Sequence, residues 1–413
     1  MRSPKSFRLH IGLFGRRNVG KSSLLNALTH QEVSIVSDIA GTTTDPVEKP
    51  MELLPLGPVL FIDTAGIDDS GALGEKRIRK TLQVIDRTDL AILVSNSREW
   101  GSFEEETLQK LRERTIPVII VLNKADFYSR NACLVNSLAQ QKLPVVETSA
   151  LQHTGIDQLR MVILKQVPES FINRQAILSD LVGQGEAAIL VVPIDKEAPK
   201  GRLILPQVQA IRDLLDGNAF CMVVKDDQLA EALSRMNKPP RLVVTDSQAF
   251  AKVAAITPPS IPLTGFSVLM ARYQADLAEM VRGAMTINNL QSGDQVLIAE
   301  ACTHHPIEDD IGTVKIPNWL NRFVGGKLQF GHVRGHDFPD NLSAYKLIIH
   351  CGACMWNRRE MLSRIMKARQ AGIPITNYGL TIAYSLGIFE RALEPFPEAL
   401  EIYRKEKIQA VKK

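Results

Sequence analysis

Short apolar runs alternate with amphipathic stretches along the first part of this 413-residue chain. The apolar runs have the length of strands, and each is bounded by polar or glycine-containing segments. They are Phe7–Phe14, Val59–Ile62, Val118–Leu122 and Val145–Val146. Helix-like periodicity follows the first run over Ser22–Leu28 and returns in a stretch that begins at Ile156. Strand-sized apolar runs that alternate with helical stretches predict an α/β fold.

The same alternation continues in the middle of the chain, between residues 176 and 264. Predicted strands are Ala187–Val192, Ala219–Val224 and Arg241–Val244, and predicted helices are Leu205–Leu215, Asp227–Met236 and Ser247–Ala254. Three prolines within Thr257–Pro262 mark a boundary. This segment lacks a cluster of catalytic residue types, so we expect it to serve in association.

A long helical stretch, Val268–Ile287, opens the last part, and strands are predicted at Gln295–Ala299 and Lys346–Ile349. A chain of this length exceeds one ordinary core, since about 150 residues per domain is usual. We therefore expect three domains, all α/β, at 1–172, 173–264 and 265–413.

Charge, hydrophobicity and cysteine content limit the cellular compartments and the classes of partner that the sequence suggests. The net charge of +4 comes from 49 basic and 45 acidic residues without a long run of either sign, so neither a nucleic-acid nor a membrane surface is demanded. No apolar run approaches the ~20 residues of a bilayer span. The first residues lack a signal-peptide core, which predicts a cytoplasmic, reducing location. The five cysteines should there be thiols or metal ligands.

The segment from Gly15 to Ser22 has the spacing G-x-x-x-x-G-K-S between a predicted strand and a predicted helix. This context is typical of a phosphate-binding loop, in which glycines let backbone N–H groups converge at a helix N-terminus. Gly15 and Gly20 shape the loop, Lys21 should neutralise the β/γ-phosphates, and Ser22 should bind Mg²⁺. Ser23 completes the predicted nucleotide-binding residues of this segment.

Two later segments fit the phosphate end of the same site. Thr42 and Thr43 follow Gly41, and either can be the switch residue on Mg²⁺. Asp63 ends a predicted strand and should hold the Mg²⁺ water, while the Gly66 amide should sense the γ-phosphate. With Lys21, Asp63 is the predicted catalytic residue, and a two-state switch is implied.

Two further segments predict the base. Asn123, Lys124 and Asp126 follow one strand, and Ser149 and Ala150 follow another. The Asp126 carboxylate can accept two N–H bonds from guanine, which adenine does not offer, so the ligand should be GTP. Taken together, the five segments resemble the G1 to G5 elements of translation-factor-class GTPases.

Two residues narrow the kind of GTPase. Ile67 stands where a Ras-like GTPase has a water-orienting glutamine, so intrinsic hydrolysis should be slow. Asn18 stands where the tRNA-modifying MnmE-type GTPases, which this domain resembles, bind K⁺ beside the β/γ-phosphates. Such an ion would supply the charge of an arginine finger. The alternative is that Asn18 caps its own backbone.

Two cysteine segments each follow a predicted strand of the last domain: Cys302-Thr303-His304 and His350-Cys351-Gly352-Ala353-Cys354. Loops at the carboxyl ends of strands gather ligands, so these two can share one site. Three thiols, two of them in C-x-x-C spacing, suit a redox dithiol, zinc or an iron–sulfur cluster. His304 and His350 can be ligands or outer contacts of a metal.

The order of these motifs resembles one family. A potassium-type GTPase domain, a middle α/β domain, C-x-H and then H-C-x-x-C is similar to the HydF family of [FeFe]-hydrogenase maturation GTPases. The resemblance implies a cytoplasmic homodimer formed through the middle domain, and a [4Fe-4S] cluster held by Cys302, Cys351 and Cys354. It further implies a diiron precursor as cargo, two radical-SAM maturases as partners, and delivery to apo-[FeFe]-hydrogenase. The identity of the fourth cluster ligand and the choice between a dimer and a tetramer stay open.

The alternative is a GTPase that acts in tRNA modification or ribosome assembly and carries a structural zinc. An RNA factor should show a basic patch with stacking aromatics. In this sequence Trp319 and Trp356 are isolated, and Arg364 lies on a predicted helix that also carries Glu360. This pattern favours the hydrogenase-maturation hypothesis.

Overall fold

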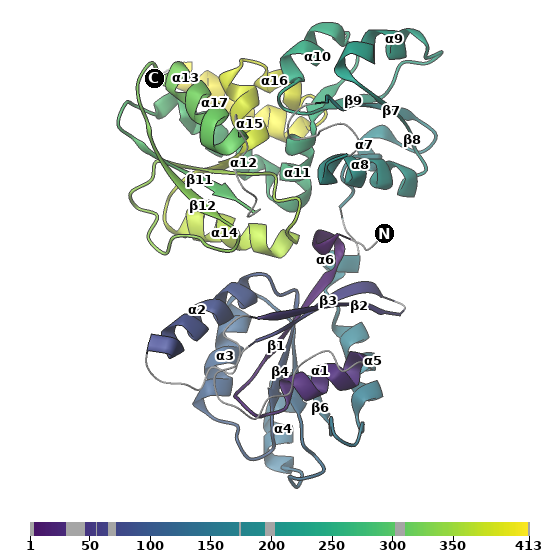
Figure 1. Ribbon diagram of the computed structural model, residues 1–413, viewed down its shortest axis with the longest axis vertical. Coiled ribbons are helices and arrows are strands. Elements are labelled where there is room, and N and C mark those ends of the chain that lie inside the picture. The colour runs from purple at the N-terminus through teal and green to yellow at the C-terminus, as the bar shows by residue number, and fades with distance from the viewer. Residues whose placement is uncertain are drawn as a thin grey trace. The chain divides into compact units, whose positions relative to one another are not determined.

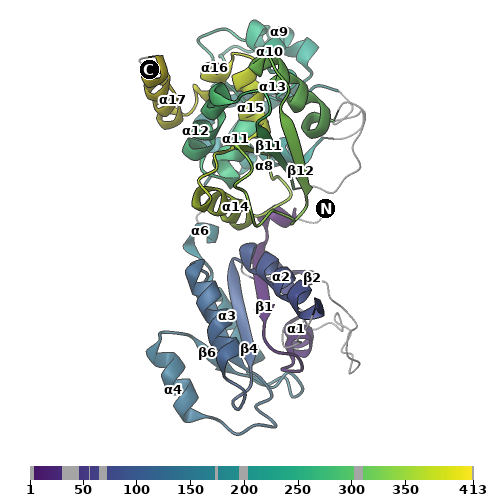
Figure 2. The same ribbon diagram turned by 90° about the vertical axis from the view of Figure 1, so that its left-hand side faces the viewer.

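A computed structural model of the chain describes residues 4–29, 46–54, 56–64, 72–172, 175–194, 203–301 and 310–411, with the backbone alone at 72–77, 170 and 409–411. Tertiary contacts divide the chain into two compact units, Met1–Arg174 and Gln175–Lys413. Figure 1 and Figure 2 show the elements of each. Among the described residues, no helix is both long and apolar enough to cross a bilayer.

The first unit is built on a six-stranded sheet in the order β2-β3-β1-β4-β5-β6, in which only β2 runs antiparallel to its neighbour. The strands are β1 (Leu9–Phe14), β2 (Val47–Leu53), β3 (Gly57–Asp63), β4 (Leu90–Ser95), β5 (Val118–Leu122) and β6 (Val145–Glu147). The helices are α1 (Lys21–Thr29), α2 (Ala72–Asp86), α3 (Ser102–Glu113), α4 (Ala132–Gln140), α5 (Ile156–Gln166) and α6 (Glu169–Ile172).

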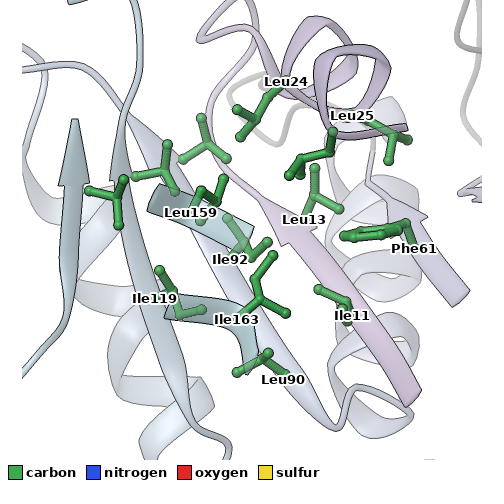
Figure 3. Packing of buried hydrophobic residues seen from close by; sticks show 14 of the residues in the cluster. Ile11, Leu13, Leu24, Leu25, Phe61, Leu90, Ile92, Ile119, Leu159 and Ile163 are labelled. Carbon is green, nitrogen blue, oxygen red and sulfur yellow. The ribbon is translucent and has the colours of Figure 1, made fainter. Parts of the chain in front are cut away.

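Burial on both faces explains the continuous apolar runs of the central strands. All residues of β1, β4 and β5 are buried, as is usual in parallel sheets covered by helices. Leucines of α1 and α5 pack on one face of the sheet (Figure 3). Side chains of α2, α3 and α4 pack on the other. The layers hold the strand ends, and thus the loops that follow them, in fixed positions.

The second unit contains two four-stranded parallel sheets (Figure 1). The first has the order β10-β9-β7-β8, from β7 (Ala187–Val191), β8 (Phe220–Val224), β9 (Leu242–Thr245) and β10 (Leu263–Gly265), with helices α7 (Ser179–Val182), α8 (Leu205–Asp216), α9 (Leu229–Ser234) and α10 (Phe250–Ile256).

The second sheet of this unit has the order β12-β11-β13-β14, from β11 (Gln295–Glu300), β12 (Gln329–Arg334), β13 (Leu347–His350) and β14 (Ile375–Asn377). Its helices are α11 (Phe266–Gln274), α12 (Leu277–Met285), α13 (Ile316–Val324), α14 (Arg358–Gln370), α15 (Tyr378–Ser385), α16 (Phe389–Leu393) and α17 (Pro397–Val411). Helix α11 contacts both α8 and α14, so it joins the two sheets into one unit.

The predicted strands are present, with ends that differ by one or two residues. The predicted single helix Val268–Ile287 is wrong, because α11 ends at Gln274 and α12 begins at Leu277. Ala275 and Asp276 between them have extended backbones, and the Asp276 side chain accepts a hydrogen bond from the Glu279 N–H at 3.1 Å. An aspartate at this position caps a new helix start, which ends the first helix.

Candidate nucleotide and metal sites

The loop from Gly15 to Lys21 curls around the Lys21 ammonium between β1 and α1. Lys21 Nζ donates to the carbonyls of Gly15 at 2.8 Å and Arg16 at 2.7 Å. Gly20 has φ 92°, and a Cβ there would lie 2.3 Å from Asn123 Nδ2. Only glycine meets both requirements at this position. The ammonium thus lies in the curve of the loop, where a phosphate-binding loop needs positive charge.

A hydroxyl and a carboxylate meet beside this loop. Ser22 Oγ donates to Asp63 Oδ2 at 2.7 Å, because β1 and β3 are adjacent and Leu13 pairs with Asp63. Asp63 Oδ1 is buried and has no hydrogen-bond partner among the described residues. Burial raises the pKa of Asp63, opposed by the Ser22 hydrogen bond and the Lys21 charge. Mg²⁺ fits this pair, because hydroxyl and carboxylate oxygens are its usual protein ligands.

The Asn123 side chain ties together three loops at the base-binding end. Its Nδ2 donates to the Val19 carbonyl at 2.9 Å, and its Oδ1 accepts from Thr148 Oγ1 and from the Ala150 N–H, each at 3.1 Å. Buried Ser149 Oγ accepts from the Gln152 N–H at 3.1 Å. These bonds fix the loops after β1, β5 and β6 around one opening.

That opening is a cavity of about 290 Å³. It is lined by Gly20, Ser23, Asn123, Lys124, Asp126, Phe127, Tyr128, Ala150 and Leu151. The volume is near the ~300 Å³ lower end of ordinary ligand cavities. The structure thus brings the predicted base-reading Asp126 and the predicted loop residues Gly20 and Ser23 to one cavity.

Of the remaining predicted residues of the nucleotide site, the structure describes Asn18 but not the two switch threonines or Gly66. Asn18 is exposed at the turn of the loop, with φ 60°, a left-handed backbone that asparagine tolerates better than most residues. Thr42, Thr43 and Gly66 lie outside the described residues. The switch residue therefore stays a prediction.

One contact of the phosphate loop was not predicted. Arg16 forms a two-pronged ion pair with Glu104 of α3, with Nε–Oε1 at 2.8 Å and Nη2–Oε2 at 3.1 Å. Glu104 is fully buried and also accepts from the Gly101 N–H at 2.9 Å. Its position in the first turn of α3 signals a capping residue. The pairing with Arg16, 88 positions away, has no signal in the sequence.

The two cysteine loops begin side by side. Strands β11 and β13 are adjacent and parallel, with Ala299 paired to His350. The Cys351 N–H donates to the Ala299 carbonyl at 2.9 Å, and the Ala301 N–H donates to Cys351 Sγ at 3.1 Å. Cys302 and His304 lie outside the described residues.

Cys351 and Cys354 are half-buried thiols that form no disulfide among the described residues. Ala353 between them is buried with φ 51°, a conformation that costs a residue with a Cβ about 1 kcal/mol. Among the described residues, no group of three His, Cys, Asp or Glu side chains could hold a metal ion. Two thiols three positions apart in one loop, with an N–H directed at the sulfur of Cys351, suit a thiolate-bound cluster, whose properties depend on such hydrogen bonds. The residues present therefore fit that group.

A buried carboxylate lies in the same region and was not predicted. Glu300 Oε1 accepts from the Tyr378 hydroxyl at 3.0 Å, and Oε2 accepts from Arg334 Nε at 2.9 Å. Burial, with the negative charges of Cys351 and Glu300, raises the pKa of Tyr378 well above its ordinary value. Tyr378 therefore keeps its proton and stays a hydrogen-bond donor beside the cysteine loop.

His350 is completely buried directly before Cys351. One ring nitrogen, Nδ1, is 2.9 Å from the Cys351 carbonyl, and the other, Nε2, is 3.1 Å from Arg364 Nη1. Burial and the Arg364 charge lower the pKa of His350 to about 3, although the Cys351 carbonyl opposes this. The imidazole is neutral at physiological pH.

The sequence of the second unit matches two domains described for one family. Residues 177–275 match the "Hydrogen maturase F dimerization domain", and residues 278–395 match the "Hydrogen maturase F tetramerization domain". These matches fill most of the second unit and, together, more than half of the chain. The chain belongs to the hydrogen maturase F, or HydF, family. It carries both oligomerization domains that the family descriptions name.

The first unit of this HydF-family chain is a P-loop GTPase domain. Residues 10–124 match the family described as "50S ribosome-binding GTPase", and they include the phosphate loop, Asp63 and Asn123. The predicted architecture, a P-loop GTPase domain followed by further α/β sheets, is thereby confirmed.

Curated relatives share this part of the HydF-family chain. It is 39% identical over 160 residues to the tRNA modification GTPase MnmE of Chromobacterium violaceum, which is 38% of this chain and 35% of the relative. It is 36% identical over 183 residues to GTPase Der of Wolinella succinogenes, which is 40% of this chain and 39% of the relative. The chain thus spans little more than a third of the length of these relatives.

One of the solved structures that the chain matches is that of a variant of Era from Aquifex aeolicus bound to GDP and AlF4⁻. It is 21% identical, and the match covers 60% of this chain and 97% of that chain with a TM-score of 0.36.

Proposed function

We propose that this protein is a cytoplasmic GTPase and scaffold that assembles the diiron precursor of the [FeFe]-hydrogenase H-cluster and delivers it to apo-hydrogenase. The contact that carries the proposal is the hydrogen bond from the Ala301 N–H to Cys351 Sγ. It joins the starts of both cysteine loops in a chain of the HydF family. GTP hydrolysis in the other unit then serves to switch partner docking.

In the GTPase unit, Lys21 and Asp63 are the proposed catalytic residues. Lys21 would leave its carbonyl partners partly to neutralise the β/γ-phosphates, and Asp63 and Ser22 would position Mg²⁺ with one of the switch threonines, Thr42 or Thr43. Bound Mg²⁺ would supply charge stabilisation at the phosphate oxygens. Replacing Lys21 or Asp63 by alanine should abolish GTP turnover, which a phosphate-release assay measures.

We also propose K⁺ as an activating ion, with Asn18 among its ligands. The exposed position of Asn18 at the turn of the phosphate loop supports this. GTP hydrolysis should be faster in KCl than in NaCl at matched ionic strength, and Asn18→Ala should remove the difference. Equal rates in both salts would reject the potassium hypothesis and leave the GTPase assignment intact.

In the second unit, Cys302, Cys351 and Cys354 are the proposed ligands of a [4Fe-4S] cluster. A cluster with three cysteine ligands leaves one iron for a weaker, exchangeable ligand, which is how cargo could be held. Each Cys→Ala change should lose iron after anaerobic reconstitution and lose maturation activity, yet keep GTP hydrolysis. Cys133→Ala, which removes an exposed cysteine of the GTPase unit, is the matched control and should keep the cluster.

The second candidate function is a tRNA-modification or ribosome-assembly GTPase with a structural zinc, which the similarity of the GTPase unit to MnmE favours. The identity of the bound metal distinguishes the two candidate functions. Anaerobically purified protein should be brown and give an EPR signal when reduced. A colourless protein with stoichiometric zinc would favour the second candidate. Iron-free Cys variants with full maturation activity would instead contradict the proposed cluster ligands.

We propose a homodimer through the middle domain, residues 173–264, between a GTPase domain at 1–172 and a cluster domain at 265–413. Strand β8 supports this, because it is at the edge of its sheet and exposes Phe220, Met222 and Val223 by 64%, 37% and 42%. An exposed apolar edge strand readily pairs with another chain. Phe220→Glu should lower the molar mass in light scattering, whereas Met161→Glu, at an exposed residue of the GTPase unit, should not.

The proposed partners are the two radical-SAM maturases and apo-[FeFe]-hydrogenase. The test is in vitro maturation: apo-hydrogenase should gain activity from this protein only after it has been loaded in the presence of both maturases. Loaded protein that binds apo-hydrogenase without activating it would contradict the delivery role.

A further inference from the structure

The side chain of Arg364 is buried beneath the loop that carries Cys351 and Cys354. Arg364 lies on α14, is only 3% exposed, and donates through Nη1 to His350 Nε2 at 3.1 Å. Its Nη2 donates to the carbonyls of Gly335 at 2.6 Å and Asp337 at 3.0 Å. One guanidinium thus connects α14, the segment after β12 and the residue that precedes the cysteine loop.

Aromatic rings surround this guanidinium. Its central carbon lies 4.2 Å from the Trp356 ring centroid and 4.7 Å from that of Phe338. Cation–π contacts with desolvated rings offset part of the cost of burying the charge. His336 stacks on Trp356 and contacts Glu360 Oε1 through Nδ1 at 2.5 Å. Trp356 and Arg364, eight positions apart in the chain, therefore belong to one packed group.

The chemistry of the partners fixes the proton on His350. A guanidinium has donors and no acceptor, so His350 Nε2 must accept. A carbonyl oxygen only accepts, so Nδ1 must carry the proton and donate to the Cys351 carbonyl. Both ring nitrogens are therefore used by the protein itself, and no lone pair is left for a metal.

The His350 bond acts on the first peptide of the cysteine loop. Within this loop, Ala353 has the unfavourable φ of 51°, and the Trp356 N–H donates to the Ala353 carbonyl at 3.0 Å. Gln274 Nε2 donates to the Trp356 carbonyl at 3.1 Å from α11. Hydrogen bonds from His350 and Gln274 thus hold the two ends of the loop, and neither bond involves a cysteine sulfur.

We propose that Arg364 is a positioning residue which, through His350, holds the Cys351–Cys354 loop in its ligand-binding conformation before any cluster binds, and that His350 is not a cluster ligand. The second part rests on the proposed cluster; the first concerns the metal-free protein. Positioning groups of this kind typically change metal affinity by about 10–100-fold when they are removed.

The first test uses the metal-free full-length protein with ¹⁵N-labelled histidine. His350→Gln identifies the His350 signals in the NMR spectrum by their loss. We expect Nδ1 to carry the proton and Nε2 to accept a hydrogen bond. A ring with its proton on Nε2 would overturn the positioning proposal whether or not a cluster ever binds.

The second test follows the reconstituted cluster. Arg364→Met should speed iron release to a chelator by at least about tenfold, whereas Arg369→Gln, which removes an exposed arginine of the same helix, should not change it. His350→Gln should retain the cluster and its EPR spectrum, because an amide can replace both hydrogen bonds. Loss of a ¹⁵N coupling to the cluster in His350→Gln, or unchanged iron release in Arg364→Met, would refute the proposal.

The tests separate this proposal from the proposed function. GTP hydrolysis in each variant reports that the chain is folded and should stay unchanged. If wild-type protein bound no iron–sulfur cluster at all, the proposed function would fail, while the NMR result would still decide whether Arg364 fixes His350. If Arg364→Met did not fold, the wild-type NMR spectrum and His350→Gln would decide the question.

Discussion

The pair Arg16–Glu104 should hold the phosphate-binding loop in shape, and Glu104→Gln tests this without removing side-chain volume. The glutamine amide has a single acceptor oxygen, so one of the two hydrogen bonds from Arg16 is lost and the other loses the charge of its acceptor. Each change is worth about 1 kcal/mol. The amide oxygen can still accept from the Gly101 N–H. Arg16 is 31% exposed and can turn partly to water, so we expect a net loss of about 1–2 kcal/mol.

Thermal unfolding and GTP affinity measure this loss. For a domain of this size, a loss of this order lowers the Tm by about 3–6 °C. If the loop must be held to bind phosphate, Kd for a fluorescent GTP analogue should rise by about three- to tenfold, since 1.4 kcal/mol is a factor of ten. Glu106→Gln, at an exposed position of the same helix, is the matched control.

A double-mutant cycle provides the refutation. Arg16→Met and Glu104→Gln should be non-additive by about 1 kcal/mol or more, because the residues are in direct contact. Additive effects on Tm and Kd would show that the pair does not act as a unit. A Glu104→Gln protein that behaves like the Glu106→Gln control would refute the reasoning as well.

Three further predictions concern pH, base selectivity and packing. Burial raises the pKa of Glu48, but the hydrogen bond from Lys5 and the Arg87 charge outweigh it and leave the pKa at about 2 against an ordinary 4.5. This stabilisation is complete above pH 4.5 and is lost as the pH falls toward 2. Above about pH 3, the free energy of unfolding of Glu48→Gln should therefore be lower than that of wild type by about 1 kcal/mol after solvent screening. At lower pH the two proteins should unfold alike. Asp126→Asn should lower GTP affinity and gain xanthosine triphosphate binding in competition assays, and unchanged selectivity would contradict its base-reading role. A Cβ on Gly283 of α12 would lie 1.9 Å from the Ile375 carbonyl oxygen of β14, so Gly283→Ala should lower the stability of the second unit by about 1–3 kcal/mol. Chemical unfolding measures this against exposed Arg282→Ala, and equal stability of the two variants would contradict it.

The sequence by itself determined features whose geometry is local. The spacing from Gly15 to Ser22 predicts a phosphate loop because glycine backbones and a helix N-terminus suffice to build one. The apolar runs predict the strands because a doubly buried strand needs continuous apolar residues. The order of C-x-H and H-C-x-x-C likewise indicated the family that the second unit matches.

Only the tertiary structure decided which distant side chains meet. The contact of Ala301 with Cys351 depends on β11 lying beside β13, and that of Arg16 with Glu104 on α3 lying beside the phosphate loop. The tautomer of His350 follows from an arginine on another element. Sheet order and helix packing bring these partners together. Both depend on the summed packing of the whole unit, so the pattern of neighbouring residues in the sequence does not predict them.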